Sequence, residues 1–584
     1  MPCIRYGAIG VATLIAAFTS GLVHGQVYDR VAPQTPTPHP SQPLKLPEEA
    51  RPAPASREVL LDVLKGIVFV ASPSALVKNG LAANEADPIR APGNPLLEDP
   101  AFVARLHPFI GEPLTRESLE RITHQADEWY RQHGRPFVGI AVPPQNISSG
   151  VVQVVVQDYR VGEVRAEGNR YFSGALLQRE SGLSAGQTLT LDGVKDSLAR
   201  LNDNPFRSVT TRFQPGTDPG TTDVVLQTSD RLPVRVYAGF DNQGIPSLGR
   251  NEWSVGANWG NVFGWDQQLS YQFTRGTSGL FNAHSLSWTA PLPNGDKLLI
   301  FGSHEKAQPD VGPDFGETGT SGQASLRYLH TLARTSWSNG LELSQNVQAG
   351  YDFKTTNNDL EFGGIQVFGS RIEIDQFSLS YDATLSDPLG QTALDNLLVY
   401  SPGGLTGANN DASFQSSLPG SSANYLYDRV VLTRVTFLPG NFNWVARIVG
   451  QWSNGNLPFS EQLGAGGLNS VRGYVTDAAL ASEGVLVSQE LRSRAFSLLK
   501  ALHRDSQVSD QLQLGVFWDY GHVHQRDPVD NQINDADLAS VGLNLHAMLG
   551  RYVDLRLDTG WQLRRAPGAS GKAALADIAL TVGF

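Results

Sequence analysis

The chain has little of several residue types, and each shortage excludes a class of protein. Its 584 residues include one cysteine, Cys3, and two methionines. A lone thiol at the start of the chain rules out internal disulfides and cysteine metal sites. Charged residues make up 17% of the chain, the formal net charge is −12 and no basic stripe stands out, so nucleic acid is not an expected partner. The 40% of apolar residues excludes general disorder.

Long hydrophobic runs are also scarce. Residues 1–25 are typical of a secretory signal peptide, with Arg5 before an apolar segment from Ile9 to Phe18. That segment is too short to span a membrane, and no later stretch offers the run of about 20 apolar residues that a spanning helix needs. We therefore expect an exported chain that begins near Gln26 and lacks Cys3. Helical membrane insertion is excluded, and insertion as a barrel is not.

Catalytic and metal motifs are absent or lack their context. Residues 182–186 match G-x-S-x-G, but the match follows a helix instead of the strand that a nucleophile elbow requires. No H-E-x-x-H and no clustered metal-ligand spacing occur among the 12 histidines. The stretch from Gly568 to Lys572 lacks the spacing and the Ser or Thr of a phosphate-binding loop. We therefore expect no enzymatic activity, no metal, no cofactor and no nucleotide.

Three segments precede the long C-terminal part of the chain. Closely spaced prolines predict that residues 26–57 form an extended linker without a helix of any length. Residues 58–158 and 159–231 each show a β-α-α-β-β pattern, and the first contains an insertion at about 72–95. Thr115 and Thr190 are the expected helix N-caps, because apolar residues follow each of them at helical spacing. We expect two small α+β domains in tandem.

Residues 232–584 are predicted to form a 16-stranded antiparallel transmembrane β-barrel. Candidate strands start near residues 233, 252, 265, 282, 296, 323, 341, 371, 392, 424, 441, 483, 511, 537, 551 and 574. Within them apolar and polar residues alternate, most clearly from Val553 to Leu563. A soluble sandwich also alternates, but hardly through so many segments with so many charges on the polar face. The last strand ends in Phe584.

One glycine-rich stretch, residues 461–482, separates two of these strands. It is too long for a hairpin turn, and its glycines surround Arg472 and Tyr474. The simplest interpretation is an exposed surface loop. A later strand, residues 511–521, places Asp519 on its polar face with Gln511 and Gln513, opposite Trp518. An acid facing a barrel lumen is available to a cation on a loop that folds inside.

Within that stretch, the run from Gly466 to Tyr474 resembles a known pattern. Its G-G-x-x-S-V-R-G-Y sequence is similar to the inward-folded sixth loop of the outer-membrane superfamily that assembles barrels and exports proteins. The residues that carry the resemblance are Val471, Arg472, Gly473 and Tyr474. The tandem domains resemble the periplasmic POTRA domains of the same superfamily.

The segment between the last two strands of the first domain is more specific. It resembles the P-x-Q-x-I-x-x-G signature of two-partner secretion transporters, carried here by Pro143, Gln145, Ile147 and Gly150. The chain is identified on these grounds as a member of the haemolysin-activator type of two-partner secretion transporters. The resemblance covers nearly the whole chain after the signal peptide.

The resemblance implies a site and a function. Arg472 is expected to pair with Asp519, and Glu490 and Arg492 on the next strand to extend the network. In a water-filled lumen such a pair is partly screened and contributes about 1 kcal/mol. Whether the family's N-terminal plugging helix is present stays open, because the prolines after Gln26 leave little room for it.

The implied activity is export of an unfolded, TpsA-like exoprotein, an adhesin or haemolysin, from periplasm to cell surface without ATP. POTRA domains in the periplasm would recognise it, through a sheet edge that the sequence does not identify. The chain is expected in outer-membrane lipid, inserted by the barrel-assembly machinery, as a monomer. A barrel-assembly factor of the same superfamily and a passive porin are the alternatives.

Overall fold

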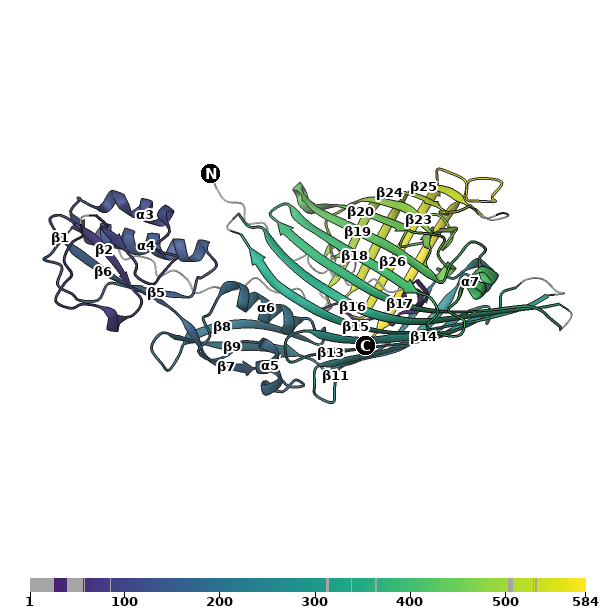
Figure 1. Cartoon of the computed structure of the whole chain (residues 1–584), viewed down its shortest axis with the longest axis horizontal. Helices are drawn as coiled ribbons and strands as arrows, with labels where there is room; N and C mark the ends of the chain where they lie inside the picture. The colour runs from purple at the N-terminus through teal and green to yellow at the C-terminus, as the bar shows by residue number, and fades with distance from the viewer. Residues whose placement is uncertain are drawn as a thin grey trace.

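The structure is a computed structural model that describes residues 26–38, 56, 58–84, 86–310, 315–337, 339–362, 365–502, 508–528, 530 and 533–584. The predicted signal peptide, residues 1–25, lies outside these ranges. Two small α/β units, residues 58–158 and 159–231, stand at one end of a large closed barrel (Figure 1). The second unit lies against the barrel and the first lies beyond it. Among the described helices, none is long and apolar enough to cross a bilayer.

The first unit contains a four-stranded sheet, ordered β3-β2-β6-β5, with two helices packed on it. Its elements are β1 (Val59–Leu61), β2 (Gly66–Val70), η1 (Pro73–Ala75), β3 (Ile89–Arg90), α3 (Pro100–Leu106), η2 (His107–Phe109), β4 (Leu114–Thr115), α4 (Arg116–Gln132), β5 (Val138–Ala141) and β6 (Val151–Asp158). Thr115 begins α4 as predicted, because its side chain accepts a hydrogen bond from the Ser118 amide. The predicted insertion supplies β3, which pairs in parallel with β2.

The second unit repeats the plan with a three-stranded sheet, ordered β7-β9-β8. Its elements are β7 (Arg160–Glu167), α5 (Gly174–Ser181), α6 (Leu191–Asn202), β8 (Arg207–Pro215) and β9 (Thr221–Asp230). The Thr190 side chain accepts from the Gly193 amide and starts α6. Val194, Leu198 and Leu201 of α6 are buried against the sheet. β8 pairs only with β9, so it forms one edge of this sheet.

The barrel is a closed antiparallel sheet of sixteen strands, in which the last strand pairs with the first. The strands are β10 (Val234–Asp241), β11 (Glu252–Val262), β12 (Gln267–Gly276), β13 (Phe281–Pro291), β14 (Lys297–Ala307), β15 (Phe315–Ser336), β16 (Glu342–Phe362), β17 (Ile365–Asp387), β18 (Gly390–Pro402), β19 (Asn424–Leu438), β20 (Phe442–Ser453), β23 (Glu483–Arg492), β24 (Asp510–His524), β25 (Asp535–Leu549), β26 (Val553–Gln562) and β27 (Ala574–Gly583). The predicted number of strands and their order are confirmed.

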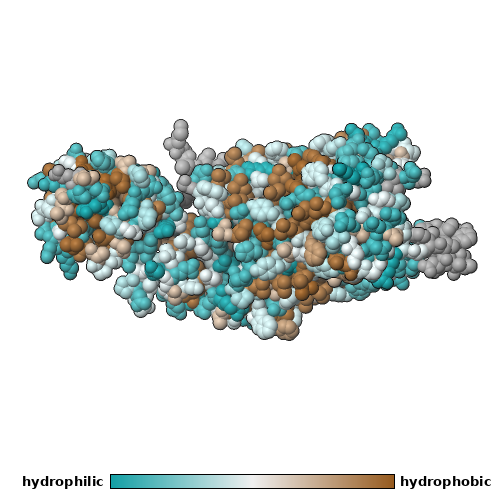
Figure 2. Space-filling model, in the orientation of Figure 1, coloured by the Kyte–Doolittle hydropathy of each residue, from teal (hydrophilic) through white to brown (hydrophobic). Residues whose placement is uncertain are grey.

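The two faces of the wall follow the alternation seen in the sequence. On β24, Leu514, Val516 and Trp518 are 40–50% exposed on the outside, whereas Phe517 and Asp519 are buried inside. Figure 2 shows apolar residues gathered over the middle of the barrel wall and hydrophilic residues at the end far from the α/β units. An apolar outer band over a polar interior is what a barrel in lipid requires.

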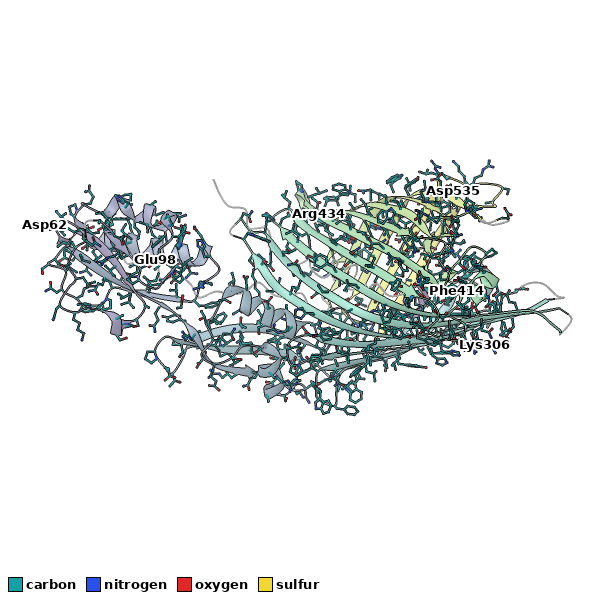
Figure 3. The ribbon with its side chains drawn as sticks, viewed as in Figure 1. Asp62, Glu98, Lys306, Phe414, Arg434 and Asp535 are labelled. Carbon is teal, nitrogen blue, oxygen red and sulfur yellow. The ribbon has the colours of Figure 1, made fainter. Side chains whose placement is uncertain are left out.

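The far end of the barrel carries the longest strands. β15, β16 and β17 extend past the rest of the wall (Figure 1). Phe414 and Asp535 lie at this end, and Arg434 lies at the end near the units (Figure 3). Phe414 belongs to α7 (Asp411–Ser417) and is fully buried against Ile372 and Ile374 of β17. The loop that contains α7 therefore packs onto the wall at the far mouth.

The linker prediction is wrong for the first described residues. Gln26–Val31 form a helix, α2, which lies inside the barrel together with the residues that follow. Arg30 pairs with Glu252 at 3.0 Å, and the Val31 carbonyl accepts from the Ser285 hydroxyl. The helix forms because its six residues contain no proline, and it ends two residues before Pro33. Residues 26–38 are called the N-terminal segment below; the rest of the predicted linker lies mainly outside the described residues.

Candidate functional site: a hook in the barrel lumen

The glycine-rich loop folds into the barrel. It leaves β20, makes a turn at η5 (Phe459–Glu461), and forms a hairpin of β21 (Leu463–Ala465) and β22 (Ala479–Ala481) before it joins β23. Residues 463–481 are called the hook below. The hairpin packs against apolar residues on the inner wall, namely Val449, Leu486, Val523, Ala536 and Leu538. Gly466 and Gly467 have φ of +116° and +97°, a backbone conformation that turns the chain out of β21 and favours glycine.

The tip of the hook binds the wall through Arg472. Its Nε donates to Asp519 Oδ2 at 2.8 Å and its Nη2 donates to Asp519 Oδ1 at 2.9 Å. The Arg472 amide also donates to Oδ2, at 3.1 Å. Two parallel bonds from one guanidinium to one carboxylate fix its orientation as well as its position. The structure thus brings together the two residues that the family resemblance paired.

Further contacts surround this pair. Arg472 Nη1 donates to Glu490 Oε2 at 2.7 Å, and the guanidinium carbon lies 3.6 Å from the centre of the Phe517 ring. Arg492 pairs with Glu490, as the sequence suggested. Asp558 of β26, which the sequence analysis did not single out, lies 3.9 Å from Arg472 and pairs with Arg556. Three arginines thus face three carboxylates.

The expected screening of the pair by lumenal water is not seen. The Arg472 and Asp519 side chains are 4% and 0% exposed, because the hook and the wall exclude solvent around them. For a buried pair, removal of one partner costs about 3–5 kcal/mol, since the other charge is left without compensation. The estimate of about 1 kcal/mol therefore describes an exposed pair and not this one.

The other three residues of the V-R-G-Y run each meet a different part of the wall. Val471 is fully buried, and its side chain packs where Gly521 of β24 leaves space. Gly473 lies on the backbone of β26 and its carbonyl accepts from Gln562 at 2.8 Å. The Tyr474 hydroxyl lies 2.8 Å from the Ala539 carbonyl oxygen of β25. The tip is therefore held by four adjacent strands, β23 to β26.

The signature of the first unit is a structural clamp. Gln145 Nε2 donates to the Gln153 carbonyl at 2.7 Å, and the Gln153 amide donates to Gln145 Oε1 at 2.8 Å. The Gln145 side chain thereby extends the sheet beside β6 after β5 has ended. Ile147 packs against the core, and Gly150 has φ of +88° with Lys65 against it. Pro143 precedes this clamp, and its carbonyl accepts from Gln145 Nε2 at 3.3 Å.

The second unit is fixed to the barrel by contacts that the sequence did not reveal. Arg207 Nη1 and Nη2 donate to Asp266 of the β11–β12 turn at 2.6 and 2.8 Å, and the Arg207 side chain is 0% exposed. Asn204 also donates to Asp266, at 2.7 Å. On α6, Lys195 pairs with Glu342 of β16, and Asp196 pairs with Arg334. No local pattern marks these residues, because each partner lies in a distant segment.

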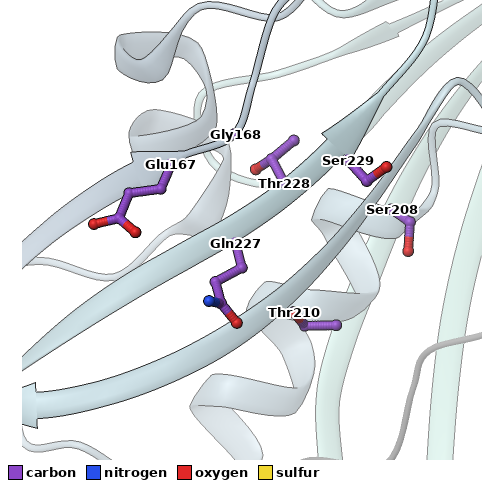
Figure 4. A pocket seen from close by; sticks show the side chains of 7 residues that line it. All are labelled: Glu167, Gly168, Ser208, Thr210, Gln227, Thr228 and Ser229. Carbon is purple, nitrogen blue, oxygen red and sulfur yellow. The ribbon is translucent and has the colours of Figure 1, made fainter.

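A shallow polar pocket of about 440 Å³ lies on the second unit (Figure 4). It is lined by Glu167, Gly168, Ser208, Thr210, Gln227, Thr228 and Ser229. These residues come from the end of β7 and from β8 and β9. The pocket therefore lies across the three strands of this sheet, and β8 is one of them.

One group at the far end of the barrel has donor atoms close enough for a metal ion. His522 lies on β24, and Asp535 and Asp537 lie opposite it on β25. Because the three residues belong to two strands, their spacing in the sequence does not reveal that they are close together. Asp537 already accepts a hydrogen bond from Tyr520 at 2.8 Å and pairs with Arg564 at 3.0 Å. Tyr520 and Arg564 therefore satisfy Asp537 without a metal ion, and the group is explained as a cluster of charged surface residues.

Comparison with known proteins gives the family. Residues 220–547 match the family described as haemolysin secretion/activation protein ShlB/FhaC/HecB, and residues 86–158 match the POTRA domain of ShlB type. The chain belongs to the ShlB/FhaC/HecB family. The match covers the second unit's last strand and most of the barrel, including the hook and Asp519.

Individual relatives agree with this assignment. The heme/hemopexin transporter protein HuxB of Haemophilus influenzae strain 86-028NP is 22% identical over 75% of this chain and 76% of its own length. The outer membrane transporter CdiB of Dickeya dadantii strain 3937 is 23% identical over 76% of this chain and 77% of its own. The structure of CdiB from Escherichia coli covers 93% of this chain and 94% of its own, with a TM-score of 0.72 and 19% identity, and so shows the same fold.

For this member of the ShlB/FhaC/HecB family, the barrel and the family together give the location. The barrel lies in the outer membrane, with the two α/β units in the periplasm. The far end with β15 to β17 and α7 is therefore the extracellular end. Family members are transporters.

Proposed function

We propose that this transporter moves an unfolded, TpsA-like exoprotein from the periplasm through the barrel to the cell surface. The observation that carries the proposal is that the hook and the N-terminal segment both occupy the lumen without being strands of the wall. Because the hook and the N-terminal segment are attached to the wall mainly by side chains, they can be displaced while the barrel sheet stays intact. A passive porin needs neither an anchored lumenal hook nor paired periplasmic units.

In this proposal, residues 58–158 and 159–231 are both POTRA domains that receive the cargo. The strand β8 is a sheet edge, and beyond Val209, whose backbone is hydrogen-bonded to the Asn202 side chain, an extended cargo segment would add to it as a further strand. The neighbouring pocket supplies hydroxyl and amide groups from Ser208, Thr210 and Gln227 for polar cargo side chains. The tight junction between Arg207 and Asp266 would hold this edge at the periplasmic mouth of the barrel.

The hook would act by position and not by chemistry. Arg472 and Asp519 hold its tip, and Glu490, Arg492, Val471, Gly473 and Tyr474 complete the docking site. We also infer that transport proceeds without ATP or catalysis, that the protein is a monomer, and that the barrel-assembly machinery reads the last strand, which ends at Phe584.

Secretion by a reconstituted pair tests the proposal. The test needs a neighbouring reading frame that encodes a large repeat-rich exoprotein, and the chain is co-expressed with that exoprotein in a Gram-negative host. We expect the exoprotein in the medium only when the transporter is present. Retention of the exoprotein in the periplasm, together with loss of unrelated outer-membrane barrels when the transporter is depleted from its own host, would favour an assembly factor instead.

A further inference from the structure

The base of the hook is anchored as firmly as its tip, through a residue to which neither the family resemblance nor the signature assigns a role. Glu461, in η5, accepts from Lys354 Nζ of β16 at 2.6 Å, and the two side chains are 0% and 2% exposed. The second carboxylate oxygen accepts from the Tyr427 hydroxyl at 3.0 Å and from Gln376 Nε2 at 3.2 Å. The adjacent Ser460 hydroxyl also donates to Glu461 Oε1 at 2.9 Å, and the other donors come from three separate strands, β16, β17 and β19.

The backbone of Glu461 is held as well. Its carbonyl accepts from Gln451 Nε2 of β20 at 3.0 Å and from Arg429 Nη2 of β19 at 3.4 Å. The base is therefore tied to β16, β17, β19 and β20, whereas the tip is tied to β23 through β26. The hook spans the lumen between two fixed points on different parts of the wall.

The base of the hook lies in a buried charged cluster and also contacts the N-terminal segment. The wall contributes Lys354, Arg429 and the buried pair of Arg327 with Asp352, whose atoms lie 2.6 Å apart. With Glu461, this set has three cations and two anions. α2 of the N-terminal segment packs against η5, the turn that carries Glu461. This contact joins the N-terminal segment to the base of the hook.

We propose that Lys354 and Glu461 are positioning residues that lock the base of the hook, and that the packing of α2 on η5 couples this lock to the N-terminal segment. Each of the two lumenal contents then stabilises the other, so loosening the base of the hook also frees the N-terminal segment. The purpose of this coupling rests on the proposed function, since export requires the lumen to be cleared. The coupling itself needs no cargo.

Thiol labelling of the full chain tests the coupling directly. Cys3 is the only cysteine, so an introduced thiol is unique once the signal peptide is removed or Cys3 is replaced. Val31 is fully buried, and V31C reacts with a membrane-impermeant methanethiosulfonate only when the N-terminal segment leaves its place. Val471 is equally buried, and V471C reports on the tip of the hook. Both are measured in proteoliposomes without exoprotein.

We expect K354M to raise the labelling rate of V31C at least tenfold, because Glu461 is left as an uncompensated buried charge. The exchange K354E with E461K restores opposite charges and should return the rate to within threefold of the parent. R434M is the matched control, since Arg434 pairs with Asp387 on the wall near the periplasmic end. V471C should change little in each variant, because the Asp519 anchor is intact.

An unchanged V31C rate in K354M would overturn the proposal. If K354M fails to fold, E461Q replaces it, because the amide keeps hydrogen-bonding groups for Tyr427 and Gln376 and removes only the charge. E461Q is expected to raise the rate threefold or more, and no change would again refute the coupling. The labelling assay contains no exoprotein, so a failed secretion test would not change the labelling result. A failed labelling test would likewise leave the proposed export function standing.

Discussion

Gly473 at the tip of the hook and Gly560 on β26 touch backbone to backbone. A Cβ on Gly473 would lie 2.9 Å from the Gly560 carbonyl group, and a Cβ on Gly560 would lie 2.6 Å from the Gly473 Cα. Neither distance is tolerated by real side chains, so this contact requires glycine on both sides. At this point the hook therefore fits the wall by close backbone packing, next to the ion pair that Arg472 forms.

The first prediction concerns this contact. G560A should push the tip off β26 and cut secretion of the exoprotein at least tenfold, while the barrel still assembles. The φ of Gly473 is +86°, so G473A adds backbone strain and should be at least as damaging. G571A is the matched control, because no atom lies within 4 Å of the added methyl group. Normal secretion by G560A would show that the close approach is dispensable.

The second prediction concerns the charge pair. D519R places two guanidinium groups together in a buried site, at a cost of about 3–5 kcal/mol or more, and should abolish secretion. Adding R472D restores opposite charges and should recover part of it. Recovery stays partial because R472D places a carboxylate beside Glu490, which loses its 2.7 Å bond from Arg472 and keeps Arg492 as its arginine partner. Secretion is measured by quantifying exoprotein in the medium. Equal failure of the single and double variants would argue against pairing as the function.

The third prediction concerns the junction of the second unit and the barrel. R207A leaves Asp266 buried with only Asn204 as a partner, and should free the unit to move. Spin labels on cysteines at Asp218 and Asp535 should then give a broad distance distribution by pulsed electron paramagnetic resonance. R212A is the control, because Arg212 and Glu167 form an exposed pair within the unit, worth about 0–1 kcal/mol. A narrow distribution in R207A would contradict a fixing role for this pair.

The fourth prediction concerns the clamp in the first unit. Q145A removes both partners of the Gln153 backbone, and a buried amide left unsatisfied costs about 1–3 kcal/mol. Hydrogen exchange of the intact protein should therefore show faster exchange in peptides that cover residues 151–157. Q132A serves for comparison, because Gln132 makes an exposed hydrogen bond with Glu128 on α4. If protection is unchanged in Q145A, the signature glutamine has a role other than holding the sheet.

The sequence predicted the barrel well because its signal is local. A strand between lipid and lumen must alternate at every second residue, so Trp518 and Asp519 already differ in direction when read as neighbours. The same rule turned Asp519 toward the lumen, and the family resemblance supplied Arg472 as its partner. Helix N-caps at Thr115 and Thr190 were likewise local signals that the structure confirms.

The missed features all depend on distant partners. Arg207 and Asp266 are 59 residues apart, and Lys354 and Glu461 are 107 apart, with no pattern that links them. The N-terminal segment was misjudged because proline content describes a window and not single residues. Residues Gln26–Val31 contain no proline, although the window around them is rich in it. Their partners in the lumen, such as Glu252, lie far away in the sequence and could not be predicted from neighbouring residues.

The position of the hook along the chain constrains how the protein is built. Arg472 is synthesised 47 residues before Asp519, and Tyr474 is synthesised 90 residues before the Arg564 carbonyl that it contacts. The docking site of the tip is therefore complete only when the later strands β24 to β26 are in place. A chain cut after Leu549 lacks β26, and trypsin should cleave it at Arg472 while the complete protein resists.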